Sequence, residues 1–150
     1  IGVYALSIVR SFMDKKPEEI VSQRKVSPTG SDEQATILLK NDLNQMAVVA
    51  LSMHSKQPKR AMISCEKGYI EIMEFPRAEK ATIVDAVTGA KTEIDCGCTA
   101  DALRYELTDM EQAVSRQNAD DMKLAFSRDV MDIMTKIRKD WNMKYPGEDW

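Results

Sequence analysis

The stretch QMAVVALSM, residues 45–53, says most about the fold. If it forms a strand, its side chains alternate between the two faces of a sheet. One face consists of Met46, Val48 and Ala50, and the other of Ala47, Val49, Leu51 and Met53. Both sets are apolar, whereas a sheet with one face in water would alternate apolar with polar residues. The stretch therefore predicts a strand in a sheet that is covered on both faces.

Short runs rich in Ile, Val and Thr surround this stretch. Turn signals such as Ser27-Pro28-Thr29-Gly30 and Glu66-Lys67-Gly68 separate the runs. The connections are too short for crossover helices, so the strands should form a largely antiparallel meander. We expect one open sheet of six or seven strands, with strands at 18–26, 33–40, 45–53, 60–65, 69–73, 80–87 and 91–95.

Helical patterns lie at both ends of the chain. Residues 1–13 are apolar on nearly all sides, and two amphipathic segments follow the strands at 101–116 and 121–141. Their apolar stripes are Leu103, Leu107, Met110 and Val114 in the first, and Met122, Phe126, Val130, Ile133, Ile137 and Trp141 in the second. The pattern predicts an α+β fold whose three helices lie mostly on one face of the sheet. The opposite face, either the Met46 set or the Ala47 set, is then free to pair with a second copy in a two-fold dimer.

Composition excludes several function classes. The chain has 150 residues, the size of one domain, and a formal net charge of −3, which does not favour nucleic acid as a partner. No apolar run is long enough to span a membrane. No two of the six glycines are two positions apart, so the G-x-G element of a dinucleotide site is absent.

The three cysteines, Cys65, Cys96 and Cys98, do not have the number or spacing of a disulfide framework. Together with His54 they could form a metal site, but reduced, structural thiols in a cytoplasmic protein are the favoured interpretation. We therefore expect no metal site in this chain.

Several motifs occur in the order typical of one enzyme family. They are IGVYALSIVR at 1–10, Pro17-Glu18-Glu19-Ile20, Thr29-Gly30-Ser31-Asp32-Glu33, ISCEKGYIEI at 63–72, Phe75-Pro76-Arg77, Tyr105-Glu106 and Tyr145-Pro146. In this order they resemble the C-terminal domain of the Gfo/Idh/MocA oxidoreductases over essentially the whole chain. The resemblance implies that residues 1–150 are a substrate-binding and oligomerisation domain. A separate dinucleotide-binding domain would precede Ile1, which is not a methionine.

The resemblance also implies site residues. The family's second domain opens with Asp-x-Gly-x-(Tyr or His), and Gly2 and Tyr4 match it. The tyrosine form is similar to the branch of glucose–fructose oxidoreductase and dimeric dihydrodiol dehydrogenase, in which Tyr4 would relay a proton beside a lysine of the missing domain. Taken without the resemblance, Tyr4 would be interpreted as a core tyrosine. In either case we expect its ring to pack in the core.

Three further residues are expected on the substrate side. Lys25 falls near a basic residue of the dihydrodiol dehydrogenases, while Phe75 and Arg77 match a loop that borders the substrate in the family. The predicted function is the substrate-side and dimerisation domain of an NAD(P)-dependent oxidoreductase acting on a sugar, polyol or cyclic diol. The missing domain would bind NAD or NADP, so this chain alone should be inactive. The alternative is a non-catalytic ligand-binding or assembly domain of the same family.

Overall fold

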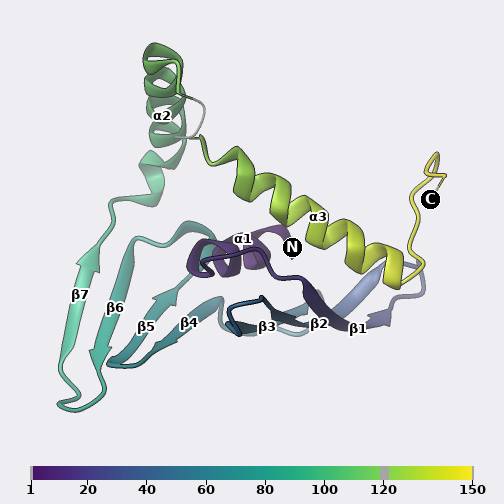
Figure 1. The fold of residues 1–150 in the computed structure, drawn as a ribbon, viewed down its shortest axis with the longest axis horizontal. Helices are drawn as coiled ribbons and strands as arrows, with labels where there is room; N and C mark the ends of the chain where they lie inside the picture. Colours follow the sequence, from purple (N-terminus) through teal and green to yellow (C-terminus); the bar gives the residue numbers. More distant parts are fainter. Residues whose placement is uncertain (1, 119–121, 150) are drawn as a thin grey trace. The chain divides into compact units, whose positions relative to one another are not determined.

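The computed structural model describes residues 2–118 and 122–149. Its elements, in chain order, are α1 (Gly2–Phe12), β1 (Glu19–Val26), β2 (Asp32–Lys40), β3 (Met46–Ser52), β4 (Arg60–Cys65), β5 (Gly68–Met73), η1 (Phe75–Arg77), β6 (Lys80–Asp85), β7 (Lys91–Asp95), η2 (Thr99–Asp101), α2 (Ala102–Arg116) and α3 (Leu124–Asp140). The predicted α+β class and every predicted strand are confirmed (Figure 1). The predicted start of the last helix, at Asp121, lies outside the described residues.

The strands form antiparallel meanders, as predicted, but in two sheets rather than one. The first sheet has the order β1-β2-β3 and the second the order β4-β5-β6-β7. The ladder stops after β3 because Pro58 has no N–H to contribute, and because the Gln57 side chain turns back to donate to the Ala50 carbonyl at 2.9 Å. The chain accordingly divides into two compact units, residues 1–57 with 125–150, and residues 58–124.

In the first unit, α1 and α3 cover one face of the three-stranded sheet (Figure 1). Ala35, Ile37 and Leu39 of β2 and Val49 of β3 are buried on this face. The helices contribute Ala5 and Leu6 from α1, and Val130, Ile133 and Ile137 from α3. The predicted stripe of the last helix is therefore confirmed at its centre, and both helices lie on the expected side.

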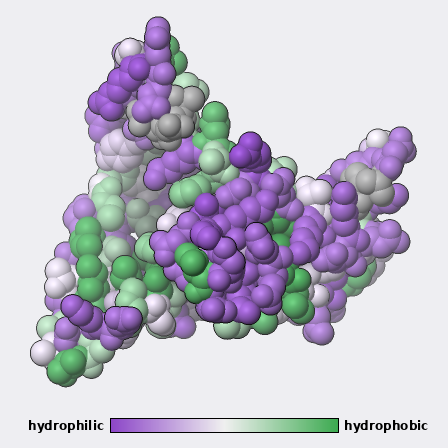
Figure 2. Space-filling model, viewed as in Figure 1, coloured by the Kyte–Doolittle hydropathy of each residue, from purple (hydrophilic) through white to green (hydrophobic). Residues whose placement is uncertain are grey.

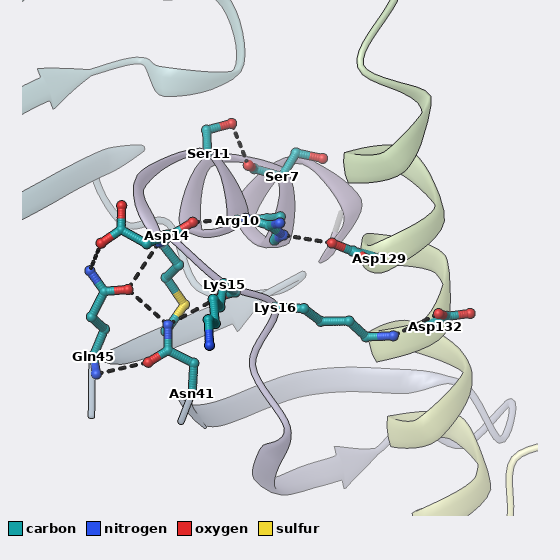
Figure 3. A network of polar contacts seen from close by, with 11 residues as sticks. Ser7, Arg10, Ser11, Asp14, Lys15, Lys16, Asn41, Gln45, Asp129 and Asp132 are labelled. Atoms are coloured by element: carbon teal, nitrogen blue, oxygen red, sulfur yellow. Dashed lines mark hydrogen bonds and ion pairs between the residues drawn. The ribbon is translucent and has the colours of Figure 1, made fainter. Parts of the chain in front are cut away.

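A buried turn joins β2 to β3 and fixes the end of α1. Asn41 is 2% exposed, and its Oδ1 accepts hydrogen bonds from the backbone N–H groups of Leu43 and Gln45 at 3.1 and 3.0 Å. Its Nδ2 donates to the Lys15 carbonyl at 3.2 Å, just beyond α1 (Figure 3). Every polar atom of this buried side chain thus has a partner, as burial requires.

Helices α1 and α3 are joined by a largely buried ion pair. Arg10 of α1 donates from Nε to Asp129 Oδ2 of α3 at 2.8 Å, and from Nη1 to the Met13 carbonyl at 2.7 Å (Figure 3). Its guanidinium carbon also lies 4.3 Å from the centroid of the Phe126 ring. An exposed pair, from Lys16 to Asp132, lies one turn further along α3.

The opposite face of the three-stranded sheet is open. Val21, Leu38 and Val48 are directly opposite one another on the three strands, and all three are exposed. Met46 extends this apolar row, while Val49 of the other face is buried. Of the two faces proposed for dimerisation, the set that begins at Met46 is therefore the accessible one.

In the second unit, one face of the four-stranded sheet is apolar. Ile63, Ile70 and Ile83 occupy one register row, with Ile94 beside them. Figure 2 shows hydrophobic side chains exposed over β6 and β7, where Ile83, Ile94 and Val87 are solvent-accessible.

The prediction that residues 101–116 cover a sheet face is wrong. The helix forms as α2, but Leu103, Leu107, Met110 and Val114 are each half or more exposed. The helix continues directly from η2, which fixes its start next to the end of β7, and among the described residues of its own unit the stripe stays exposed. None of the helices in the described part of the chain is long and apolar enough to cross a membrane.

Candidate functional site

The N-terminus of α1 lies over one end of the three-stranded sheet. A Cβ added to Gly2 would be 3.6 Å from Leu51 Cδ1, near the end of β3, whereas the Asp14 backbone N–H meets Gln45 Oε1 before the start of β3. The helix therefore runs antiparallel to β3, and its first turn lies over the end of the sheet that contains Leu51. Tyr4 belongs to this first turn.

Tyr4 is not a core tyrosine. It is 57% exposed, so the prediction that its ring packs in the core is wrong. Helix α1 buries Ala5, Leu6 and Arg10. Because successive residues are about 100° apart, Tyr4 falls on the opposite side of the helix from the centre of this buried face. The exposed ring leaves the phenol accessible to a ligand.

A charged cluster lies at the same end of the sheet. Lys25, near the end of β1, donates from Nζ to Glu33 Oε1 at 2.5 Å, beside a register shift between β1 and β2. The Glu33 carbonyl accepts the Met53 N–H at 2.9 Å, which brings the residues after β3 to the same place. Next to it, Gln34 donates to the hydroxyls of Ser52 and Ser55 at 3.4 and 3.3 Å.

The electrostatics of this cluster favour a charged Glu33. The hydrogen bond from Lys25 lowers the pKa of the Glu33 carboxyl, and the charges of Lys25 and His54 lower it further. Glu33 is therefore a carboxylate at neutral pH. It belongs to the quoted Thr29–Glu33 motif, but the sequence analysis assigned it no role. Its place at the start of the predicted strand 33–40 was the available signal, and the pairing with Lys25 appears only in the fold.

Phe75 and Arg77 share one turn in the second unit. Glu74, at φ 51°, begins the 3₁₀ turn η1, and the Arg77 N–H closes it on the Glu74 carbonyl at 2.9 Å. The Arg77 carbonyl accepts the Thr99 hydroxyl at 2.9 Å, which ties this loop to the residues that follow β7. Arg77 itself is exposed, and Phe75 is half-buried.

The predicted site residues therefore form two groups. Tyr4 and Lys25 belong to the first compact unit, at the same end of its sheet, and Phe75 and Arg77 belong to the second. Within residues 2–118 and 122–149, no three His, Cys, Asp or Glu side chains lie close enough to hold a metal ion.

The turn at Gly97, which leads into η2 and α2, does not fit the pyrophosphate of a nicotinamide dinucleotide. Its backbone donors are already engaged. The N–H groups of Gly97, Cys98 and Thr99 bond Asp95 Oδ1, the Tyr105 hydroxyl and Glu79 Oε1. Two of these partners are carboxylates, which repel a pyrophosphate rather than bind it.

Comparison with known proteins identifies a fold. No protein-family profile matches the chain, and no curated protein sequence matches it. Among solved structures it is similar to UDP-N-acetylglucosamine 3-dehydrogenase GnnA from Acidithiobacillus ferrooxidans, with a TM-score of 0.70 and 17% identity. The match covers 89% of this chain but only 45% of that protein. At this identity the match shows a shared fold, and it confirms the α+β fold that was expected from the sequence.

Proposed function

We propose that this chain is the substrate-side domain of an NAD(P)-dependent oxidoreductase acting on a sugar, polyol or cyclic diol. The observation that carries the proposal is the fold likeness to a sugar-nucleotide dehydrogenase, of which this chain spans less than half. The family motif Gly-x-Tyr at Gly2 and Tyr4 supports it, because the structure leaves that tyrosine accessible. NAD or NADP would be bound elsewhere in the protein, since the residues here do not fit it.

Tyr4 would handle the proton of the reacting hydroxyl. A substrate hydroxyl that is being oxidised loses a proton, and a positioned phenol oxygen can accept that proton and pass it on. Lys25 would hold a polar group of the substrate, while its pairing with Glu33 fixes the position of its ammonium. In the second unit, Phe75 and Arg77 would supply an apolar surface and a hydrogen-bond donor to a bound substrate.

The first prediction concerns which part of the protein binds the dinucleotide. The isolated chain should bind neither NAD nor NADP, whereas the whole protein should bind one of them. Isothermal titration of both proteins with both dinucleotides measures this difference. A micromolar dissociation constant for the isolated chain would show that the dinucleotide site is here.

The rival function is a non-catalytic ligand-binding or assembly domain. The two differ in turnover. A whole protein that reduces its nicotinamide cofactor in the presence of sugar nucleotides, polyols or cyclic diols is an enzyme. A whole protein that binds these compounds without any change in nicotinamide absorbance supports the rival.

The open face of the three-stranded sheet is the proposed homodimer interface. Its exposed row of Val21, Leu38 and Val48, with Met46, is an apolar patch of the kind that marks an interaction site. A standard interface buries roughly 800 Å² on each partner. The isologous contact of a two-fold dimer would place this patch against its own copy.

We therefore expect a dimer that a charge on this row dissociates. Val48 is 69% exposed, so Val48→Lys should leave the fold intact and yield a monomer at micromolar concentration. Val87→Lys, at the even more exposed β6–β7 hairpin, is the matched control and should remain dimeric. Light scattering distinguishes the two states. A monomeric wild type, or a Val48→Lys dimer, would exclude this interface.

The cytoplasm is the proposed compartment. The three cysteines are free and exposed, which fits a reducing environment. Because all three side chains are exposed, none of them packs as a buried structural thiol.

A further inference from the structure

Two thiols lie two residues apart on a loop whose backbone is fixed. Cys96, Gly97 and Cys98 connect β7 to η2, and both cysteines are free and exposed. The Cys96 N–H donates to the Glu79 carbonyl at 2.7 Å, and the Gly97 N–H donates to Asp95 Oδ1 at 3.0 Å. The next two N–H groups bond Tyr105 and Glu79. Four consecutive backbone donors are thus held by this unit itself.

Gly97 gives the loop a bend that only glycine accepts easily. Its φ is +109°, and a Cβ there would lie 2.9 Å from the Tyr105 hydroxyl oxygen. Two trans peptide bonds separate the cysteine Cα atoms by at most about 7.3 Å when extended, and bending shortens this distance. A disulfide needs Cα atoms about 4.4–6.8 Å apart, a range within the reach of a bent three-residue segment.

We propose that Cys96 and Cys98 form a reversible disulfide within this loop, and that a low-molecular-weight disulfide of the glutathione class is the oxidant. One cysteine thiolate attacks the oxidant and releases one thiol, which leaves a mixed disulfide. The second cysteine then attacks the protein sulfur of that mixed disulfide and releases the second thiol. In total, two cysteine thiols lose two protons and two electrons, and one small disulfide becomes two small thiols.

The surroundings favour this chemistry over metal binding. Among the described residues, no third His, Cys, Asp or Glu joins the pair in a group that could hold a metal ion. Cys65 cannot compete for either thiol, because it lies at the other end of the sheet. It pairs with Gly68 at the start of β5, whereas Cys96 and Cys98 lie near the end of β5 that leads into η1. Exposed disulfides are the readily reduced class, so the bond should open again in a reducing cytoplasm.

The disulfide would constrain a loop that contacts both the Phe75–Arg77 turn and helix α2. Thr99, next to Cys98, donates its hydroxyl to the Arg77 carbonyl, and Tyr105 of α2 accepts the Cys98 N–H. Closing the ring therefore constrains the connection between β7 and α2 and the contact with the Phe75–Arg77 turn. This consequence is independent of whether that turn binds a substrate.

Trypsin separates the relevant thiols cleanly. Cys96 and Cys98 fall in the tryptic peptide 92–104, and Cys65 falls in the peptide 61–67. The reduced chain is equilibrated with mixtures of oxidised and reduced glutathione, its free thiols are alkylated, and the digest is examined by mass spectrometry. We expect peptide 92–104 to become about 2 Da lighter than its reduced form and to resist alkylation, and excess dithiothreitol to restore two alkylation sites.

Three variants complete the test. Cys98→Ser should stop at one glutathione on Cys96, and Cys96→Ser at one on Cys98, whereas Cys65→Ser should still form the loop disulfide. Two glutathiones on the wild-type peptide 92–104, or a cross-link from it to peptide 61–67, would overturn the proposal. So would a purified protein whose two thiols resist alkylation until a chelator is added, since that result indicates a bound metal.

Discussion

Replacing Tyr4 by phenylalanine in the whole protein should reduce turnover by about 10²–10⁴-fold, the usual effect of losing a positioned acid–base group. The substitution keeps the ring and removes only the phenol oxygen. Because Tyr4 is 57% exposed, the change removes no core packing, and the melting temperature should remain within about a degree or two. Turnover and thermal unfolding measured on the same preparation separate the two effects.

A second tyrosine provides the matched control. Tyr145 is 53% exposed, close to the value for Tyr4, but its ring stacks against the Arg138 guanidinium near the end of the chain. Tyr145→Phe makes the same chemical change at a distance in sequence from the proposed site, and we expect near-normal turnover. Near-normal turnover in Tyr4→Phe as well would exclude the proton relay.

Replacing Arg10 by methionine should destabilise the chain by up to about 3–5 kcal/mol, the cost of removing one partner of a fully buried ion pair. Arg10 is 8% exposed, and its loss leaves the Asp129 carboxylate and the Met13 carbonyl without their donor. Methionine fills most of the same volume, so the main cost is the uncompensated charge. Urea denaturation of the isolated chain measures the free energy of unfolding.

Lys16, in the segment between α1 and β1, forms an exposed counterpart of this pair. It bonds Asp132 of α3 at 2.7 Å, but both side chains are well exposed, so Lys16→Met should cost only about 0–1 kcal/mol. The double variant Arg10→Met with Asp129→Ala should recover part of the loss, because no buried charge remains. Equal losses in the free energy of unfolding for Arg10→Met and Lys16→Met would contradict a special contribution from the Arg10–Asp129 pair.

The order and type of the elements could be predicted because local rules act strongly on them. Each strand lies between turn residues and contains branched apolar residues, so its position does not depend on distant contacts. Even the two-faced apolar strand at 46–52 was visible in the sequence. The sequence could not decide which of its faces α1 and α3 cover. Both sets of alternating side chains are apolar, so either face could pack against the helices.

Other features depended on contacts that no local pattern encodes. The stripe from Leu103 to Val114 has the spacing of a buried helix face, yet it has no partner within its unit. The break after β3 depends on Pro58 and Gln57, which also suit an ordinary turn. Pairing of Lys25 with Glu33 requires the register of β1 and β2, and the exposure of Tyr4 depends on the rotation of α1 about its axis. These features required the three-dimensional structure.

The Arg10–Asp129 pair joins residues 119 positions apart, and this separation has a consequence for biosynthesis. The first unit is interrupted: residues 58–124 are inserted between its sheet and its last helix. During translation the inserted unit is complete before α3 is made, whereas the part of the earlier sheet's apolar face that α3 covers stays exposed until then. Contacts of such high sequence separation slow folding. The nascent first half should therefore be a chaperone client until the last helix leaves the ribosome, and the inserted segment should be replaceable by a short flexible linker.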